Sequence, residues 1–197
     1  MALTTLDIKE PGLSTLPPGV ERYVVEGGGL TGIQILPDDE IEIINSEGNQ
    51  VCEISVFNKD GKSELAILGL KKIKDNSEIK NILFKKDETS LQALLQLKKR
   101  NLNIEKSESS LIFNEETKAG ENIKLKSKDK CYCIIAAPGK EMMVHEQNPS
   151  TELIVMVKRS EVKKDKEFSI IPDPVYDPSN EINIARTTAN SYQVKEG

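Results

Sequence analysis

Two cysteines at alternate positions, Cys131 and Cys133, are the residues of this chain best suited to metal or redox chemistry. Alternate side chains of a β-strand lie on one face, so both thiols would point the same way. Zinc needs four ligands, and the other soft candidates are only Cys52 and His145. We therefore expect no metal site, and we interpret both cysteines as small buried residues of a core strand.

A glycine-rich segment, residues 27–32 (GGGLTG), matches the G-x-G-x-x-G spacing of dinucleotide-binding loops. Such a loop must open a helix whose N-terminus faces the pyrophosphate. Here Gly32 is followed by Ile33 and Ile35, and then by Pro37 and an acidic turn, which argues against a helix. We expect a glycine-rich β-hairpin loop and no cofactor bound by this chain.

The single histidine, His145, has Glu141 and Glu146 near it. No nucleophile or orienting partner occurs at a recognisable spacing from it. The sequence also lacks a Ser-His-Asp order and a glycosidase-like pair of carboxylates. We therefore predict no catalytic, cofactor-binding or metal-binding residue, and the chain alone is not expected to be an enzyme.

Composition limits the partners. The 197 residues are 30% charged, with a net charge of −5, and they offer no basic face for a polyanion. The apolar runs are far shorter than the roughly 20 residues that cross a bilayer, and the start of the chain does not resemble a signal peptide. Three cysteines, an odd number, fit reduced thiols. We expect a cytoplasmic protein that binds neither nucleic acid nor membranes.

Alternation of apolar and polar residues with a period of two predicts a mainly β fold. Short strands are expected at residues 34–36, 40–44, 52–57, 110–113, 122–125, 131–136 and 152–157. One stretch, residues 89–100, has helical spacing of its leucines, a Thr89–Gln92 capping box and a basic end. The polar stretch 71–86 fits a short helix or a loop. The predicted fold is mainly β (α+β): an antiparallel β-sandwich or barrel-like module with one amphipathic helix.

The predicted domain organisation has three parts: a β-rich module at residues 1–162, a proline-rich linker at 163–180, and the truncated start of a second, related β module at 181–197. Three prolines in the linker fix their own φ angles and disfavour helix in the residues before them. Residues 190–197 (NSYQVKEG) repeat the pattern of residues 21–27 (ERYVVEG), which suggests an internal repeat.

Residues 21–29 (ERYVVEGGG) and 45–53 (NSEGNQVCE) resemble the N-terminal region of large bacterial folate-dependent aminomethyltransferase-like proteins. These proteins combine a β-rich module, related to the urea carboxylase-associated family, with a C-terminal domain like the glycine-cleavage T-protein. Some members are trimethylamine-N-oxide demethylases. Residues 134–139 and 181–189 are also similar, so the resemblance covers most of residues 19–197.

The resemblance implies that the chemistry lies outside this chain. The next module of such proteins carries a Gly-x-Gln-Cys-x-Asp motif for the metal, and the distant C-terminal domain binds folate. At residues 48–53 of this chain, Val51 stands in the place of the cysteine and Glu53 in that of the aspartate. Gln50 is expected to close a turn by hydrogen bonding. No cofactor is expected in this chain; tetrahydrofolate and zinc or iron are expected in the parent protein.

The favoured function is that of an N-terminal, noncatalytic β module, a fragment of a folate-dependent aminomethyltransferase or methylated-amine demethylase. Its expected partners are the remaining domains of the parent chain and, in a homo-oligomer, further copies of itself. The alternative is a self-contained β-barrel that binds a small ligand. Such a barrel would need an interior pocket, lined by Ile43, Ile54, Phe113 and Ile134.

Overall fold

The computed structural model describes residues 8–9, 16–17, 19–72, 77–85, 87–139 and 149–160. It divides the chain after Glu161, so every described residue belongs to the first unit. The predicted linker at 163–180 and the predicted second module at 181–197 lie outside the described residues. His145, Glu141 and Glu146 lie outside them as well.

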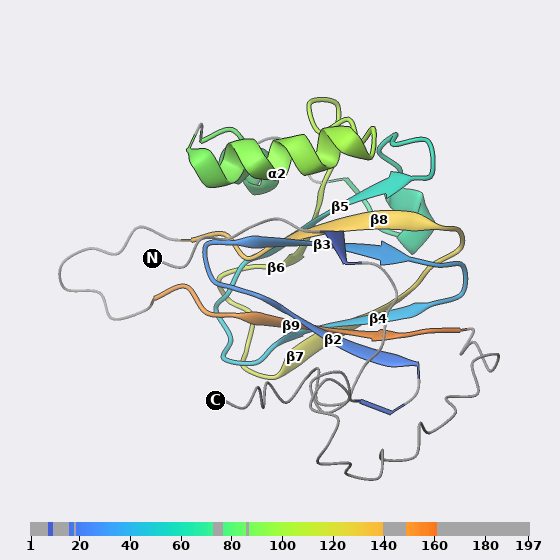
Figure 1. The fold of residues 1–197 in the computed structure, drawn as a ribbon. Coiled ribbons are helices and arrows are strands. Elements are labelled where there is room, and N and C mark those ends of the chain that lie inside the picture. The colour runs from blue at the N-terminus through green and yellow to red at the C-terminus, as the bar shows by residue number, and fades with distance from the viewer. Residues whose placement is uncertain are drawn as a thin grey trace, which may run out of the picture. The chain divides into compact units, whose positions relative to one another are not determined.

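The described residues form nine strands in two sheets (Figure 1). The five-stranded sheet has the order β1 (Ile8–Lys9), β3 (Leu30–Ile35), β8 (Cys131–Ala136), β5 (Cys52–Asn58) and β6 (Ser110–Phe113). The four-stranded sheet has the order β2 (Val20–Val25), β9 (Leu153–Lys158), β4 (Glu40–Asn45) and β7 (Glu121–Lys126). All neighbouring strands are antiparallel except β1 and β3.

The sheets confirm the predicted mainly β, sandwich-like fold, and the described strands do not close into a barrel. Each of the seven predicted strands overlaps an observed one. The strands at 110–113 and 131–136 agree with β6 and β8 at both ends. In strands such as β4 and β9, buried and partly exposed residues alternate clearly, which is the pattern on which the prediction rests.

Three helical segments accompany the sheets: the 3₁₀ helix η1 (Leu65–Leu68), α1 (Glu78–Leu83) and α2 (Glu88–Lys99). The predicted helix at 89–100 is therefore confirmed with a shift of one residue, and part of the stretch 71–86 forms α1. The N-cap of α2 is Asp87 rather than the predicted Thr89, because an Asp87 carboxylate oxygen accepts from the Ser90 amide at 2.7 Å. Within the described ranges, no helix is long and apolar enough to cross a membrane.

The five-stranded sheet is the middle of three layers (Figure 1). One of its faces packs on the four-stranded sheet, around residues such as Ile33, Cys133 and Val155. Its other face packs on α1 and α2, where Ile134 of β8 contributes to a second core. Both faces of β8 are thus covered, which explains why five of its six residues are buried.

Only part of the predicted apolar face of α2 packs on the sheet. Leu97 is buried and Leu94 is partly buried against the core beneath the helices, whereas Leu91 and Leu95 are 52% and 58% exposed. Ser90 and Ala93 are buried on the same side as Leu97. Small side chains at the first two of these positions let the helix approach closely, so the leucine-rich stripe is left on the outside.

The glycine-rich segment is not a hairpin loop, because the two strands that flank it belong to different sheets. β2 pairs with β9, and β3 pairs with β8. Gly28 has a φ of +79° and donates its amide to the Ala137 carbonyl at 2.7 Å. The glycines therefore make a crossover between the two layers, where the backbone bends sharply beside the end of β8.

The four residues proposed to line an interior ligand pocket do not share a cavity. Ile43, Ile54 and Phe113 pack in the core between the sheets. Ile134 lies in the other core, beneath the helices. These positions serve packing, and they give no support to the ligand-binding barrel.

Candidate functional site

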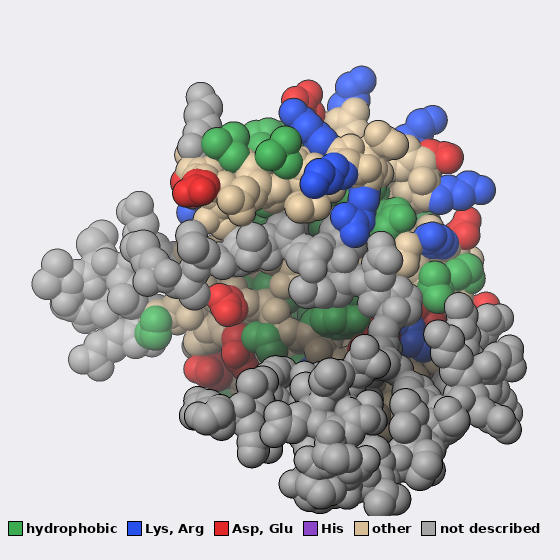
Figure 2. All heavy atoms as spheres, in the orientation of Figure 1, with side chains coloured by type: hydrophobic (Ala, Val, Ile, Leu, Met, Phe, Trp, Pro, Cys, Tyr) green, Lys and Arg blue, Asp and Glu red, His purple; other side chains and the backbone are tan. Residues whose placement is uncertain are grey.

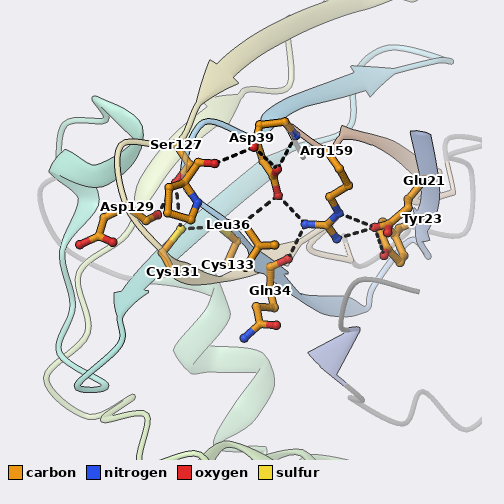
Figure 3. Close-up of polar contacts among 12 residues, drawn as sticks. Glu21, Tyr23, Gln34, Leu36, Asp39, Ser127, Asp129, Cys131, Cys133 and Arg159 are labelled. Atoms are coloured by element: carbon orange, nitrogen blue, oxygen red, sulfur yellow. Dashed lines mark hydrogen bonds and ion pairs between the residues drawn. The ribbon is translucent and has the colours of Figure 1, made fainter. Parts of the chain in front are cut away.

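The described residues hold a buried cluster of charged side chains centred on Arg159, which directly follows β9 (Figure 3). One guanidinium nitrogen, Nη1, donates to Asp39 Oδ2 at 2.7 Å and to the Gln34 carbonyl at 3.0 Å. Nε donates to Glu21 Oε2 at 3.0 Å, and Nη2 contacts the same oxygen. The guanidinium thus uses its planar fork to join three separate segments of the chain.

Each partner is fixed by its own element. Glu21 lies on β2, and Asp39 lies in the turn between β3 and β4. Asp39 Oδ2 also accepts from the Leu36 amide at 2.9 Å, and its Oδ1 accepts from the Ser160 amide at 2.8 Å. The turn and the last described residues are therefore held together by one carboxylate.

The Arg159 side chain is 5% exposed and the Asp39 side chain is 0% exposed. Burial opposes the charge of Arg159, but hydrogen bonds and attraction from Glu21 and Asp39 outweigh it and raise the pKa of the guanidinium. One cation thus lies between two carboxylates.

Tyr23, on β2, extends this cluster towards its edge. Its hydroxyl donates to Glu21 Oε2 at 2.6 Å. Burial, followed by the hydrogen bond and the charge of Glu21, raises the pKa of Tyr23 from 10.0 to about 12. The phenol therefore stays protonated in the folded chain at a pH where it would ionise in the unfolded chain.

This shift predicts a loss of stability at alkaline pH. The folded state keeps its phenolic proton between pH 10 and about 12, whereas the unfolded state releases it, so the contribution is complete below pH 10 and is lost as pH rises towards 12. Urea denaturation across this pH range should show a steeper decline for the native chain than for Tyr23→Phe. Parallel declines would contradict the prediction.

The two cysteines of β8 behave as predicted from their spacing. Cys131 and Cys133 are both 0% exposed, and their Sγ atoms lie 3.9 Å apart. Their hydrogen bond lowers the pKa of Cys131, whereas the same contact and burial raise that of Cys133. Burial also raises the pKa of Cys52. Within the described ranges, no three His, Cys, Asp or Glu residues are grouped to hold a metal.

Gln50 lies in the segment that aligns with the metal motif of the resemblance. It is 4% exposed. Its Nε2 donates to the carbonyls of Val51 and Pro138, both at 3.0 Å, and its Oε1 accepts from the Thr151 amide at 2.8 Å. Gln50 therefore does more than close its own turn, because it also joins the ends of β8 and β9.

Glu53, in the same segment, has a role that the sequence analysis missed. Its carboxylate accepts from Ser77 Oγ at 2.6 Å and from the amides of Glu78 and Ile79 at 2.5 and 3.3 Å. These amides form the N-terminus of α1, where a negative charge is favoured. Both carboxylate oxygens are thus engaged in holding α1 on β5.

A surface hollow of about 670 Å³ lies beside the β4–β5 turn. Its carboxylates, from Glu47, Glu78 and Glu115, would favour a cation over an anion. The Thr151 hydroxyl has no hydrogen-bond partner in the described part of the chain. The described lining holds no histidine, cysteine or lysine and comprises Glu47, Gly48, Asn49, Gln50, Val51, Glu78, Glu115, Pro138, Gly139, Pro149, Ser150 and Thr151.

The fold and the site define a class: a β-sandwich module with helices on one outer face and an ionic cluster in which the charged groups engage one another. No family model matches the chain. The chain is similar to the trimethylamine-oxide aldolase of Ruegeria pomeroyi, with 34% identity over 191 residues. The match covers 96% of this chain but 24% of that relative, so the chain spans about a quarter of its length.

A solved structure is more distantly similar. It is a DUF1989 family protein from Silicibacter pomeroyi, with a TM-score of 0.41 and 10% sequence identity. The match covers 73% of this chain and 80% of that one. A likeness of this size carries no argument about function.

Proposed function

We propose that this chain is a noncatalytic β module of a larger enzyme that acts on trimethylamine oxide or a related methylated amine. The observation that carries the proposal is the 34% identity to trimethylamine-oxide aldolase, which extends over 96% of this chain and a quarter of that protein. The chain corresponds to one part of that enzyme, and the reaction is assigned to the remainder. Its partners are then the other domains of the parent chain.

The engagement of the polar groups supports a structural role. Arg159 forms ion pairs with both Glu21 and Asp39, and the three cysteines are buried. The same cluster reaches Ser160, whose amide and hydroxyl bind Asp39 at 2.8 and 3.3 Å. The backbone is thus fixed where it leaves β9, which suits a module that must orient the chain that follows.

In the described segment that aligns with the metal motif, the residues do not fit the metal implied by the resemblance. Val51 offers no ligand, and the Glu53 oxygens already accept from the start of α1. Cys52 is fully buried and faces the core between the sheets. We therefore assign tetrahydrofolate and zinc or iron, as cofactors of a folate-dependent aminomethyltransferase or demethylase, to domains outside this chain.

The test begins by sequencing the encoding DNA past the codon for Gly197. The extended protein and the 197-residue chain are then compared in two assays. Proton NMR follows the consumption of trimethylamine oxide, and inductively coupled plasma mass spectrometry measures bound zinc and iron. We expect turnover and metal in the extended protein alone. A stop codon directly after Gly197 would overturn the proposal, as would stoichiometric metal in the short chain that disappears in Cys131→Ser/Cys133→Ser.

A further inference from the structure

The outer face of α2 carries an apolar stripe that nothing in the described structure covers. Leu91 and Leu95, one helical turn apart, are 52% and 58% exposed. Figure 2 shows hydrophobic side chains gathered over α2, with basic side chains towards the C-terminal end of the helix. A solvent-facing pair of leucines at this spacing is typical of a helix that packs against a second helix.

Charges of opposite sign bracket the stripe. Glu88 begins the helix, and Lys98 and Lys99 end it; all three are exposed. They lie three or four residues from the nearest leucine of the stripe, so they lie on the same face. From the N-terminus to the C-terminus of α2, its outer face therefore carries an acidic residue, then the two leucines, and then two basic residues.

We propose that the outer face of α2 binds the same face of a second copy of this chain, with the two helices antiparallel. A two-fold axis between Leu91 and Leu95 places each leucine against the partner's leucines. It also places Glu88 of one copy against the two end lysines of the other, twice over. A parallel arrangement would set like charges against each other at both ends, so the charge order selects the antiparallel one.

The stripe is self-complementary, and this favours a second copy over an unrelated partner. A helix of about 12 residues is about 18 Å long, which limits the contact to the small end of protein interfaces. We expect a reversible dimer with a Kd on the order of 100 µM. This inference goes beyond the proposed function and does not depend on it, because it concerns the surface of this module alone.

The apolar part is tested by sedimentation velocity of the 197-residue chain, from about 10 µM to about 1 mM, a range that brackets this affinity. With increasing protein concentration, the average mass of the sedimenting species should rise from the 21.9 kDa of one chain towards twice that value. Leu91→Lys/Leu95→Lys should weaken association at least about tenfold. The matched control is Leu111→Lys, a leucine on β6 that is 46% exposed and does not belong to the stripe, which should leave association unchanged.

The charge order is tested by two variants that are mixed. Glu88→Lys alone and Lys98→Glu/Lys99→Glu alone should each associate more weakly than the native chain, because each homodimer then repels at both ends. Their equimolar mixture should regain a dimer, because both ends of the mixed pair attract. Recovery on mixing also shows that both variants are folded, which circular dichroism of each checks independently.

A native chain that stays monomeric up to about 1 mM would overturn the proposal, and so would equal weakening by Leu111→Lys. A mixture that associates no better than its components would overturn the antiparallel arrangement. Neither result bears on trimethylamine oxide turnover or metal content, so failure of this inference and failure of the proposed function are distinguishable.

Discussion

Replacement of Arg159 by methionine is expected to lower the free energy of unfolding of the 197-residue chain by about 3–5 kcal/mol in urea denaturation. Methionine keeps part of the aliphatic stem but removes the guanidinium. Glu21 and Asp39, whose side chains are 8% and 0% exposed, then lose the guanidinium as a hydrogen-bond donor and counter-charge. Water cannot easily take the place of the lost donor groups at these buried carboxylates, and this loss makes up most of the cost.

The matched control is the preceding residue, Lys158, which ends the same strand. Its Nζ lies 4.0 Å from Glu40, and the two side chains are 71% and 58% exposed. Exposed pairs of this kind contribute little, so Lys158→Met should leave the free energy of unfolding unchanged within error. Equal losses in the two variants would mean that the buried cluster has no special role.

A second substitution separates charge from packing. Because the cost of Arg159→Met is assigned to stranded carboxylates, Glu21→Gln should be less destabilising in that background than in the native chain. The coupling is obtained from a double-mutant cycle in urea. Strictly additive losses would indicate that the arginine acts through its packed stem alone.

The strands were predictable because their signal is local. Strands such as β4 and β9 alternate buried and partly exposed residues. The predicted stretches 110–113 and 131–136 agree with β6 and β8 at both ends. The partners of these strands were not predictable. The glycine-rich segment 27–32 is predicted as a hairpin loop, because nothing near it in the sequence reveals that β2 pairs with β9 and β3 with β8.

The face of α2 was not predictable for a related reason. Its leucines lie at helical spacing, but they are spread over more than one side of the helix. The side that is buried against the sheet is the one with Ser90, Ala93 and Leu97. Burial of small residues depends on how closely two elements approach. That distance is set by the tertiary structure, and the local sequence does not contain it.

The ionic cluster was missed because its members are far apart in the chain. Arg159 and Glu21 are separated by 138 residues, and Arg159 and Asp39 by 120. One signal could have pointed to it. The chain has 23 lysines and only four arginines, so an arginine directly after a core strand suggests a site that needs the planar guanidinium rather than a point charge.

Gly61→Ala is expected to lower the free energy of unfolding by about 2–4 kcal/mol, because two penalties act together. Gly61 is buried and has a φ of +76°, a conformation that strains an alanine. An added Cβ would also overlap the Asn101 carbonyl oxygen and lie 2.8 Å from the carbonyl carbon. The obstacle is backbone, so no side-chain rotation can relieve it. Thermal denaturation should show a fall of about 2–4 °C per kcal/mol.

Gly69→Ala is the control that isolates the contact. Gly69 has a similar φ of +70°, yet an added Cβ would meet nothing within 4 Å. Its cost should therefore be the conformational part alone, about 1 kcal/mol. The excess at Gly61 then measures how firmly the β5–η1 loop holds the chain after α2, where the Asn103 amide donates to the Gly61 carbonyl at 3.1 Å. Equal costs at the two glycines would mean that the segment after α2 can move aside, and that α2 is anchored by its buried face alone.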